Sequence, residues 1–409
     1  MSESPVLRSA PDLRADAAQL LDDLVALRRD LHQHPEVGLD LPRTQQAVLE
    51  ALAGLDLEIT LGRSSTSIVA VLRGAEPGPT VLLRGDMDAL PIVEQVELPY
   101  RANNGLMHAC GHDLHAAGLV GAAHLLAARR DQIAGSVVFM FQPGEEGHDG
   151  AGHMLEEGVL EASGQAPEAA YAIHVGTGER GMFWTGVGPV LASSSTLRVA
   201  LTGRGGHAST PSAALDPVPA LAELVPAMQV VVTRAVNVSD PAVLTVTRLG
   251  AGDADNVIPD RAWLSGTLRT FSAATLDLLE ERLAALVDGI AAAHGLSADF
   301  ELERGYPATV NDEATTVRVE ELIRAEFGAE RHARIATPYM GSEDFSRVLE
   351  RVPGCYIFLG AKPDHVAAGA TYPHASDAEY DDAVLADQAA LLALLAWQHV
   401  GADEPPPQR

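Results

Sequence analysis

The sequence has few cysteines, almost no lysine and no long apolar run, and each shortage excludes a class of protein. Only Cys110 and Cys355 are cysteines among 409 residues, too few and too far apart for a disulfide framework, so both are expected to be thiols. No apolar run approaches the roughly 18 residues of a membrane-spanning helix. Lysine occurs once, at Lys362, outside any Gly-rich phosphate-binding motif, which excludes a P-loop nucleotidase.

Positive charge is also scarce, since the formal net charge is −28. Such a surface repels nucleic acid and anionic membranes, and its simplest role is to keep the protein in solution. An anionic substrate would therefore need a local arginine. The N-terminus lacks the basic start followed by an apolar stretch that marks an exported protein, so we expect a cytoplasmic location.

The order of apolar runs predicts an α/β fold with a second, inserted domain. Residues 80–88 and 135–142 are contiguous apolar runs separated by helical patterns, which is typical of parallel strands buried on both faces. A later segment instead has half-exposed strands in the order β-α-β-β-α-β, typical of a ferredoxin-like α+β domain. We expect a larger α/β domain with a mostly parallel central sheet, in segments 1–188 and 307–409, and a smaller α+β domain inserted at 189–306.

The stretch HACGHDLH, residues 108–115, gathers three histidines and a cysteine. Cys110 and His112 are separated by one residue, so in extended chain their side chains point the same way and could bind one metal ion. His108, two residues before Cys110, faces the same way in extended chain and is an alternative ligand. We expect His115 to pack against, or cap, the helix that follows. A C-x-H pair alone is more often a packed thiol beside a surface imidazole than a metal site.

Two adjacent glutamates, Glu145 and Glu146, follow directly after a buried apolar run. Neighbouring residues in extended chain face opposite sides, so one carboxylate could bind a metal while the other acts as general base on a water molecule. Taken alone, the pair is more often a solvated acidic turn.

Two further histidines complete a candidate metal site. His174 ends an apolar run, and His374 lies in the loop TYPHASDAEYDD. With Cys110, His112 and Glu146 they form a set of imidazole, thiolate and carboxylate groups that suits Zn, Mn, Co or Ni. Five ligands exceed what one tetrahedral zinc ion needs, which favours two metal ions with a bridging ligand.

Seven motifs, in this order, closely resemble the M20 metallopeptidase family. They match the branch of bacterial and plant amidohydrolases that act on N-acyl amino acids, such as hippurate hydrolase and auxin-conjugate hydrolases. The resemblance extends from about residue 28 to His374. The motifs are LRGDMDALPIVE, MHACGHDLHAA, FQPGEEG, GRGGHASTP, NVIP, GTLRT and MGSEDF.

This resemblance implies a two-metal amidohydrolase with two divalent ions per subunit, Zn, Mn, Co or Ni. Glu145 corresponds to the general base, and Asp88 to a carboxylate that orients a ligand, as a metal-bound histidine requires. Cys110 takes the bridging position that an aspartate holds elsewhere in the family. The implied metal ligands are Cys110, His112, Glu146, His174 and His374.

For the smaller domain, the resemblance implies a lid or dimerisation domain and a homodimer. His207 corresponds to a residue that reaches the partner's active site and polarises the scissile carbonyl. Asn256 and Arg269 correspond to residues that bind the free carboxylate of a small-molecule substrate, for which the bidentate guanidinium is well suited.

The chain departs from the branch at several positions. Gly144 replaces the usual alanine before the paired glutamates, and His148 and His153 follow them, where they either perturb the site or are simply solvated. The segment around His374 also differs from the usual form, so this ligand has the weakest support.

Other functions are weighed against hydrolysis of N-acyl amino acids. The segment GTGERG fits a dinucleotide-binding fingerprint but no helix follows it, and no G-x-S-x-G nucleophile motif occurs. A dipeptidase, a carboxypeptidase or an N-acetyl-diaminopimelate-type deacetylase remains open, because the same centre would cut any amide. A non-catalytic binding protein is disfavoured, since binding alone needs no general base.

Overall fold

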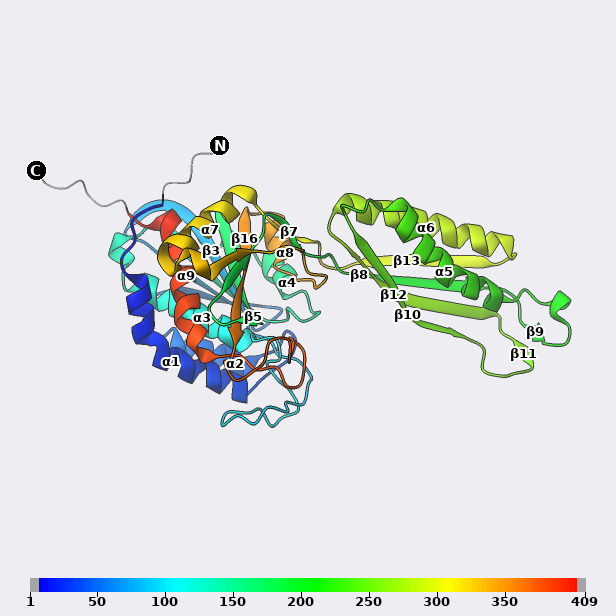
Figure 1. The fold of residues 1–409 in the computed structure, drawn as a ribbon, viewed down its shortest axis with the longest axis horizontal. Helices are drawn as coiled ribbons and strands as arrows, with labels where there is room; N and C mark the ends of the chain where they lie inside the picture. The colour runs from blue at the N-terminus through cyan, green and yellow to red at the C-terminus, as the bar shows by residue number, and fades with distance from the viewer. Residues whose placement is uncertain (1–6, 403–409) are drawn as a thin grey trace, which may run out of the picture. The chain divides into compact units, whose positions relative to one another are not determined.

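The computed structural model describes residues 7–402, which form two compact units (Figure 1). The composition of the C-terminal tail GADEPPPQR predicts disorder, and residues 403–409 of it lie outside the described range. The segment Pro338–Ser346 belongs to the second unit, although we had assigned it to the larger domain. The first unit comprises Met1–Val190, Val310–Thr337 and Arg347–Arg409, and the second comprises Leu191–Thr309 and Pro338–Ser346.

An eight-stranded sheet forms the centre of the first unit. Its strands are β1 (Glu58–Leu61), β2 (Ile68–Arg73), β3 (Glu76–Asp86), β4 (Ala134–Gln142), β5 (Ala169–Glu179), β6 (Phe183–Thr185), β15 (His332–Arg334) and β16 (Gly354–Lys362). The order across the sheet is β1-β2-β4-β3-β5-β16-β6-β15. The middle strands β4, β3, β5 and β16 run parallel, and antiparallel pairings occur only toward the edges. The predicted α/β class with a mostly parallel central sheet is confirmed.

Helices cover this sheet, which explains why its middle strands are apolar without alternation. Helices α1, α3 and α9 contact one another, and α3 and α9 pack against β3. Gly121 of α3 allows the close approach, because a Cβ there would lie 2.8 Å or less from Ala389 and Leu24. The helices of this unit are α1 (Leu13–Gln33), α2 (Pro42–Ala51), α3 (His112–Ala127), α4 (Gly150–Glu156), α7 (Glu313–Phe327) and α9 (Leu385–Val400), and the short α8 (Ser346–Leu349) lies at the unit boundary.

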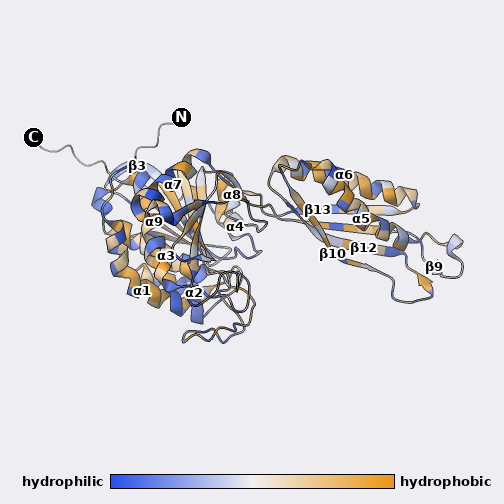
Figure 2. Cartoon of the chain, viewed as in Figure 1, coloured by the Kyte–Doolittle hydropathy of each residue, from blue (hydrophilic) through white to orange (hydrophobic). Residues whose placement is uncertain are grey.

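The second unit has a four-stranded antiparallel sheet in the order β10-β12-β8-β13. The chain enters it after β7 (Gly188–Leu191) and leaves it at β14 (Thr309–Asn311). Burial alternates along the third strand of this order, as expected for a strand with one covered face. The elements are β8 (Ser195–Thr202), β9 (Gly206–His207), α5 (Pro217–Ala235), β10 (Ala242–Ala251), β11 (Val257–Ile258), β12 (Arg261–Thr270), α6 (Ala273–Ala293) and β13 (Ser297–Arg304). Helix α6, like α1, carries both hydrophobic and hydrophilic residues (Figure 2).

Two helical stretches are long and apolar enough to span a membrane, although we had expected none. They are Pro217–Ala235 and Asp382–Val400. The second contains α9, and 72% of its apolar window is buried in the core of the first unit. The first is α5, whose buried residues Leu221, Leu224 and Met228 belong to the core of the second unit. Of the apolar window of α5, 22% is buried, and length and composition alone do not distinguish a helix that packs into a core from one that spans a membrane.

Candidate metal centre

Side chains that could bind metal come from the turns and loops that follow β3, β4 and β16 and from His174 within β5. Three overlapping groups each have their ligand atoms within 4.8 Å of one another. Cys110 belongs to two of these groups, so the five predicted ligands converge around its sulfur. The groups are Cys110 with His112 and His174, Cys110 with Glu146 and His374, and His112 with Glu145 and Glu146.

A tight turn places Cys110 beside His112. We had reasoned from extended chain, but Cys110 lies in a turn and His112 is the first residue of α3. Gly111 between them has a φ of +81°, and a Cβ there would lie 2.4 Å from a methyl group of Val175. Only glycine therefore fits at this position, and it allows the thiol and the imidazole to face the same point.

Glu145 and Glu146 also lie in a turn, not in the extended chain that we had assumed. Both carboxylates consequently approach His112 on the same side. The turn is held by Asp88, whose two carboxylate oxygens accept the backbone N–H groups of Glu145 at 3.1 Å and Glu146 at 3.0 Å. Asp88 Oδ1 also lies 3.4 Å from Nδ1 of His112, so one carboxylate lies against three predicted site residues.

The imidazole of His174 is oriented by its own strand. Its Nδ1 lies 2.6 Å from the carbonyl oxygen of Val175, and a carbonyl can only accept, so Nδ1 carries the hydrogen. The other nitrogen, Nε2, is 3.5 Å from Sγ of Cys110. Burial, with help from the neighbouring His115, lowers the pKa of His174 well below its ordinary value. His174 therefore presents a neutral nitrogen lone pair toward the thiol, as a metal ligand must.

His374 reaches the group from a distant loop. Its backbone has a φ of +67°, and its N–H donates to the carbonyl oxygen of Ala109 at 3.0 Å. This hydrogen bond ties the loop to the HACGHDLH segment. The ring nitrogen Nε2 lies 2.9 Å from Oε1 of Glu146, although half of the side chain is exposed.

Asp86 and Arg84 are two buried residues beside the candidate ligands that we had not assigned to the site. Asp86, at the end of β3, lies 3.6 Å from Nε2 of His112 and accepts a hydrogen bond from His115. Arg84 donates to the other side of this carboxylate. Burial opposes the charge on Asp86, but Arg84, His112 and His115 outweigh it and hold its pKa well below the usual range.

These residues fit a pair of divalent cations. Both ring nitrogens of His112 are buried without a hydrogen bond. Burial disfavours its imidazolium form, but Asp86 and Asp88 raise the pKa of His112 well above its ordinary value. Burial also raises the pKa of the Cys110 thiol to about 12. Cations bound here would replace these protons and neutralise the surrounding carboxylates.

His108 lies outside these groups of ligand atoms. It is 1% exposed, and its ring centre is 6.3 Å from that of His32. His32 in turn contacts Asp113 at 2.8 Å and Glu94 at 3.0 Å. This buried polar cluster fastens the start of α3 to α1. His108 packs against it with both ring nitrogens lacking a hydrogen bond, and it is absent from the groups of ligand atoms around Cys110.

The two histidines after the paired glutamates stay outside the described metal-binding groups. His148 is exposed and packs near Gly38. His153 lies in α4 with its Nδ1 3.4 Å from the hydroxyl of Ser64. Neither contributes to the groups around Cys110.

His207 and Asn256 lie together at one end of the second unit. The backbone N–H of Ala208 donates to the carbonyl oxygen of Asn256, and β9 pairs with β11 there. His207 and Asn256 line a pocket of about 440 Å³. The N–H of Ser209 donates to Nδ1 of His207 at 3.1 Å, so a neutral His207 carries its hydrogen on Nε2 and can donate outward.

Arg269 lies in the four-stranded sheet of the second unit, at the end away from the segment that leads to His207. Arg261, at the start of β12, pairs with Thr202 beside the segment that leads to His207, whereas Arg269 pairs with Val243 near the other end. Eight residues of strand separate these positions by roughly 26 Å. One terminal nitrogen of Arg269 is buried without a hydrogen bond, and burial lowers the pKa of this guanidinium. Within one copy, Asn256 thus groups with His207 and not with Arg269.

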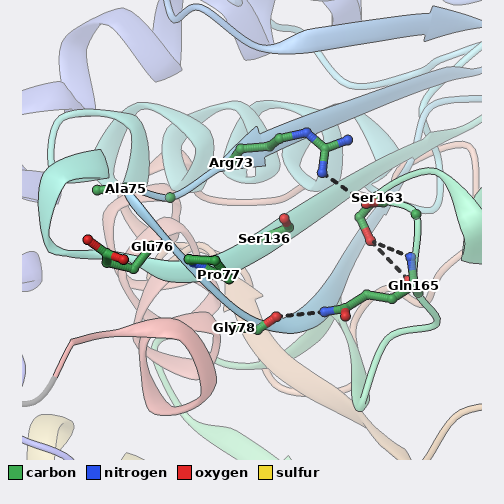
Figure 3. Close-up of a pocket in the computed structure, with 11 residues that line it drawn as sticks. Arg73, Ala75, Glu76, Pro77, Gly78, Ser136, Ser163 and Gln165 are labelled. Atoms are coloured by element: carbon green, nitrogen blue, oxygen red, sulfur yellow. Dashed lines mark hydrogen bonds between the residues drawn. The ribbon is translucent and has the colours of Figure 1, made fainter.

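A pocket in the first unit lies away from the candidate metal ligands. It lies at the beginning of β3 and β4 (Figure 3). Its volume is about 380 Å³. Cys110, Glu145 and Glu146 instead follow the carboxyl ends of these strands. Arg73 donates to the carbonyl oxygen of Ser163 at 2.9 Å, and Gln165 donates to that of Gly78 at 2.7 Å. Small molecules bind α/β sheets at the carboxyl ends of the strands, which favours the Cys110 site.

The chain is similar to known proteins over most of its length. Residues 82–398 match the family described as Peptidase family M20/M25/M40. Thermostable carboxypeptidase 1 of Saccharolobus solfataricus is 34% identical over 94% of this chain and 97% of its own. IAA-amino acid hydrolase ILR1-like 2 of Arabidopsis thaliana is 35% identical over 94% of this chain and 87% of its own. The crystal structure of the Bacillus subtilis YXEP protein, described as a dinuclear metal-binding peptidase of the M20 family, superposes with a TM-score of 0.80. It is 31% identical and covers 93% of this chain and 98% of its own.

Proposed function

The chain belongs to peptidase family M20/M25/M40, whose members hydrolyse amide bonds, and we propose that it cleaves N-acyl amino acids to a carboxylic acid and a free amino acid. The observation that carries this proposal is the sharing of Cys110 between two groups of ligand atoms, with Glu145 beside them. A binding protein would need neither a bridging thiolate nor a buried general base.

The site suits two divalent cations, for which we propose Zn, Mn, Co or Ni. His112 and His174 would hold one with Cys110, and Glu146 and His374 would hold the other. When bound, such ions act as Lewis acids that polarise the amide carbonyl and lower the pKa of the attacking water.

Glu145 is assigned as the general base. Its side chain is 7% exposed, and its carboxylate belongs to the same group of ligand atoms as those of His112 and Glu146. It would take a proton from the attacking water and then deliver it to the leaving amine. Asp88 fixes the backbone of Glu145 and so sets the direction of this carboxylate.

We propose that the second unit takes part in substrate recognition within a homodimer. Its β-α-β-β-α-β order and antiparallel sheet agree with a ferredoxin-like lid or dimerisation domain. His207 would donate Nε2–H to the developing oxyanion, and Asn256 and Arg269 would bind the free carboxylate. Asn256 lies with His207 beside the two-stranded sheet of β9 and β11, whereas Arg269 lies near the far end of β12, so the two can bind the same carboxylate only if they come from two copies.

A carboxypeptidase or dipeptidase activity is the second candidate. It is favoured by the printed activity of the Saccharolobus relative, which covers almost the whole chain. An N-acetyl-diaminopimelate-type deacetylase is a third possibility of the same chemistry. We place the enzyme in the cytoplasm, without nucleic-acid or membrane partners, because its bridging ligand is a thiol that must stay reduced and its net charge is −28.

A substrate panel tests the proposed reaction. Metal-free protein is loaded with Mn, Co or Zn and assayed on hippurate, N-acetyl amino acids, indole-acetyl amino acids, N-acetyl-diaminopimelate and dipeptides. We expect kcat/KM to be highest for an N-acyl amino acid and to vanish with a chelator. A higher value for unmodified dipeptides would favour the second candidate, and no hydrolysis with any metal would contradict both.

Mixing two inactive variants tests the shared site. Glu145→Gln removes the base, and His207→Ala removes the donor that we assign to the partner. After subunit exchange the mixture should recover about a quarter of wild-type activity, since half of the dimers are mixed and each has one complete site. No recovery in a mixture proven to contain mixed dimers would contradict the assignment of His207.

A further inference from the structure

His115 lies between two of the candidate metal ligands. It follows His112 by one turn of α3 and is 1% exposed. Its ring centre is 5.3 Å from that of His112 and 4.7 Å from that of His174. It forms a group of possible ligand atoms with Asp86 and His112 but does not belong to the groups around Cys110, and both of its ring nitrogens already have hydrogen-bond partners within the protein.

The hydrogen bonds of His115 determine which of its nitrogens carries the hydrogen. The backbone N–H of Val175 lies 2.8 Å from Nε2 of His115, and a peptide N–H can only donate. Nε2 is therefore the acceptor. The hydrogen of the neutral ring is on Nδ1, where it is donated to the carboxylate of Asp86.

The residue that His115 holds is the one that orients His174. Val175 donates its N–H to His115 and accepts the Nδ1–H of His174 with its carbonyl oxygen. The result is a continuous chain of hydrogen bonds from Asp86 through His115 and the Val175 backbone to His174. At its end, Nε2 of His174 faces the sulfur of Cys110.

We propose that His115 is a positioning residue of the metal centre, which holds the Val175 backbone so that His174 presents Nε2 to the ion shared with Cys110 and His112. The proposal rests on the metal site of the proposed function. Groups that orient a metal ligand in this way commonly change metal affinity by about 10–100-fold when removed.

Two substitutions separate the two hydrogen bonds of His115. The side-chain oxygen of glutamine can occupy the place of Nε2 and accept from Val175, whereas the amide of asparagine occupies the place of Nδ1 and can only serve Asp86. We expect His115→Gln to keep the metal dissociation constant within about threefold of wild type. We expect His115→Asn to weaken metal binding by about 10–100-fold.

Metal binding is measured on metal-free protein by competition with a chromophoric chelator, using Mn(II), Zn(II) and Co(II). The visible spectrum of the Co(II) protein gives a second readout, because the d–d bands depend on the orientation of the ligands; it should change in His115→Asn and be retained in His115→Gln. Chemical unfolding of the metal-free variants tells whether a loss of affinity comes only from a loss of fold. His124→Gln, on the same helix and hydrogen-bonded to Ala51, is the control and should match wild type.

The outcomes are distinct. Tighter metal binding by His115→Gln than by His115→Asn, at similar unfolding free energies, supports the positioning role. Equal affinities, or tighter binding by His115→Asn, overturn it, because His115 would then serve only as a partner of Asp86 or as packing. A wild-type protein that binds no divalent metal would instead overturn the proposed function on which this inference rests.

Discussion

The sulfur of Cys110 lies 3.5 Å from Nε2 of His174. These residues are 64 positions apart, one in the turn before α3 and the other in β5. The sulfur of Cys110 also lies within 4.8 Å of ligand atoms of Glu146 and His374. A buried thiol shared by two groups of candidate ligands is the arrangement that a bridging ligand requires.

Glu145→Gln should abolish amide hydrolysis without removing the metal ions. Glutamine has nearly the same shape but cannot accept a proton, so kcat should fall by at least about 10³-fold, within the range for loss of a general base. Metal content, measured by elemental analysis, should be unchanged. Glu161→Gln, at an exposed position that ends a short helix of the same unit, should keep full activity. Activity near the wild-type rate in Glu145→Gln would remove Glu145 from the mechanism.

Asp88→Asn should weaken metal binding as well as catalysis. The new amide group keeps one acceptor but points N–H groups at a backbone N–H, so the turn of Glu145 and Glu146 loses one of its two hydrogen bonds. We expect a loss of about 10–100-fold in metal affinity, measured by chelator competition. The exposed Asp40→Asn is the control. Unchanged affinity would show that Asp88 does not orient the site.

Arg269→Ala should reduce selectivity for a free carboxylate. We expect kcat/KM for an N-acyl amino acid to fall about 100-fold, because a charge-assisted pair is lost. The corresponding N-acyl amino-acid amide, which carries no charge for Arg269 to bind, should lose at most about threefold. Arg261→Ala, at the other end of β12, is the matched control. An equal loss on both substrates would indicate a structural role for Arg269.

The burial of His399 should make stability depend on pH. Burial, aided by Arg318 and Arg8, lowers the pKa of His399 to about 4, whereas the unfolded chain titrates near 6.5. The unfolded state binds more protons between these values, so the free energy of unfolding falls as the pH drops from about 6.5 toward 4. We expect about 2 kcal/mol of this fall to be absent in His399→Gln.

Chemical unfolding of metal-free protein at pH 7 and pH 4.5 measures the effect of His399. Only the difference between wild type and His399→Gln is interpreted, because other groups titrate in the same range. His124→Gln provides the comparison with a histidine whose side chain instead contacts a backbone carbonyl. The same pH dependence in His399→Gln and wild type would show that His399 is not buried as a neutral ring.

The residue types in the sequence indicated most of the candidate metal site, but the backbone conformation that we assumed for these residues was wrong. Cys110 and His112 were paired by assuming extended chain, and Glu145 and Glu146 were assigned to opposite faces for the same reason. Both pairs lie at turns, where glycines with positive φ at positions 111, 144 and 147 turn the chain. A glycine beside each pair was the available signal, and local alternation cannot describe such turns.

The supporting residues could be found only in part. Asp86 and Asp88 in the motif GDMD are two residues apart and face the same way in a strand, and His115 follows His112 by three residues on a helix. Spacing alone could therefore have nominated Asp86 and His115 as residues near the site. The role of Val175 depends on which backbone groups meet after folding. The separation of Asn256 from Arg269 likewise follows from the register of β12 with β8 and β10, which no sequence motif encodes.

The central claim is that Cys110 bridges two cations, and anomalous diffraction from crystals grown with Mn(II) or Zn(II) tests it most directly. The account predicts two anomalous peaks per chain, about 3.5–4 Å apart, with the Cys110 sulfur bound to both. His112 and His174 should be bound to one peak, and Glu146 and His374 to the other. A single peak, or two peaks of which only one contacts Cys110, would contradict it.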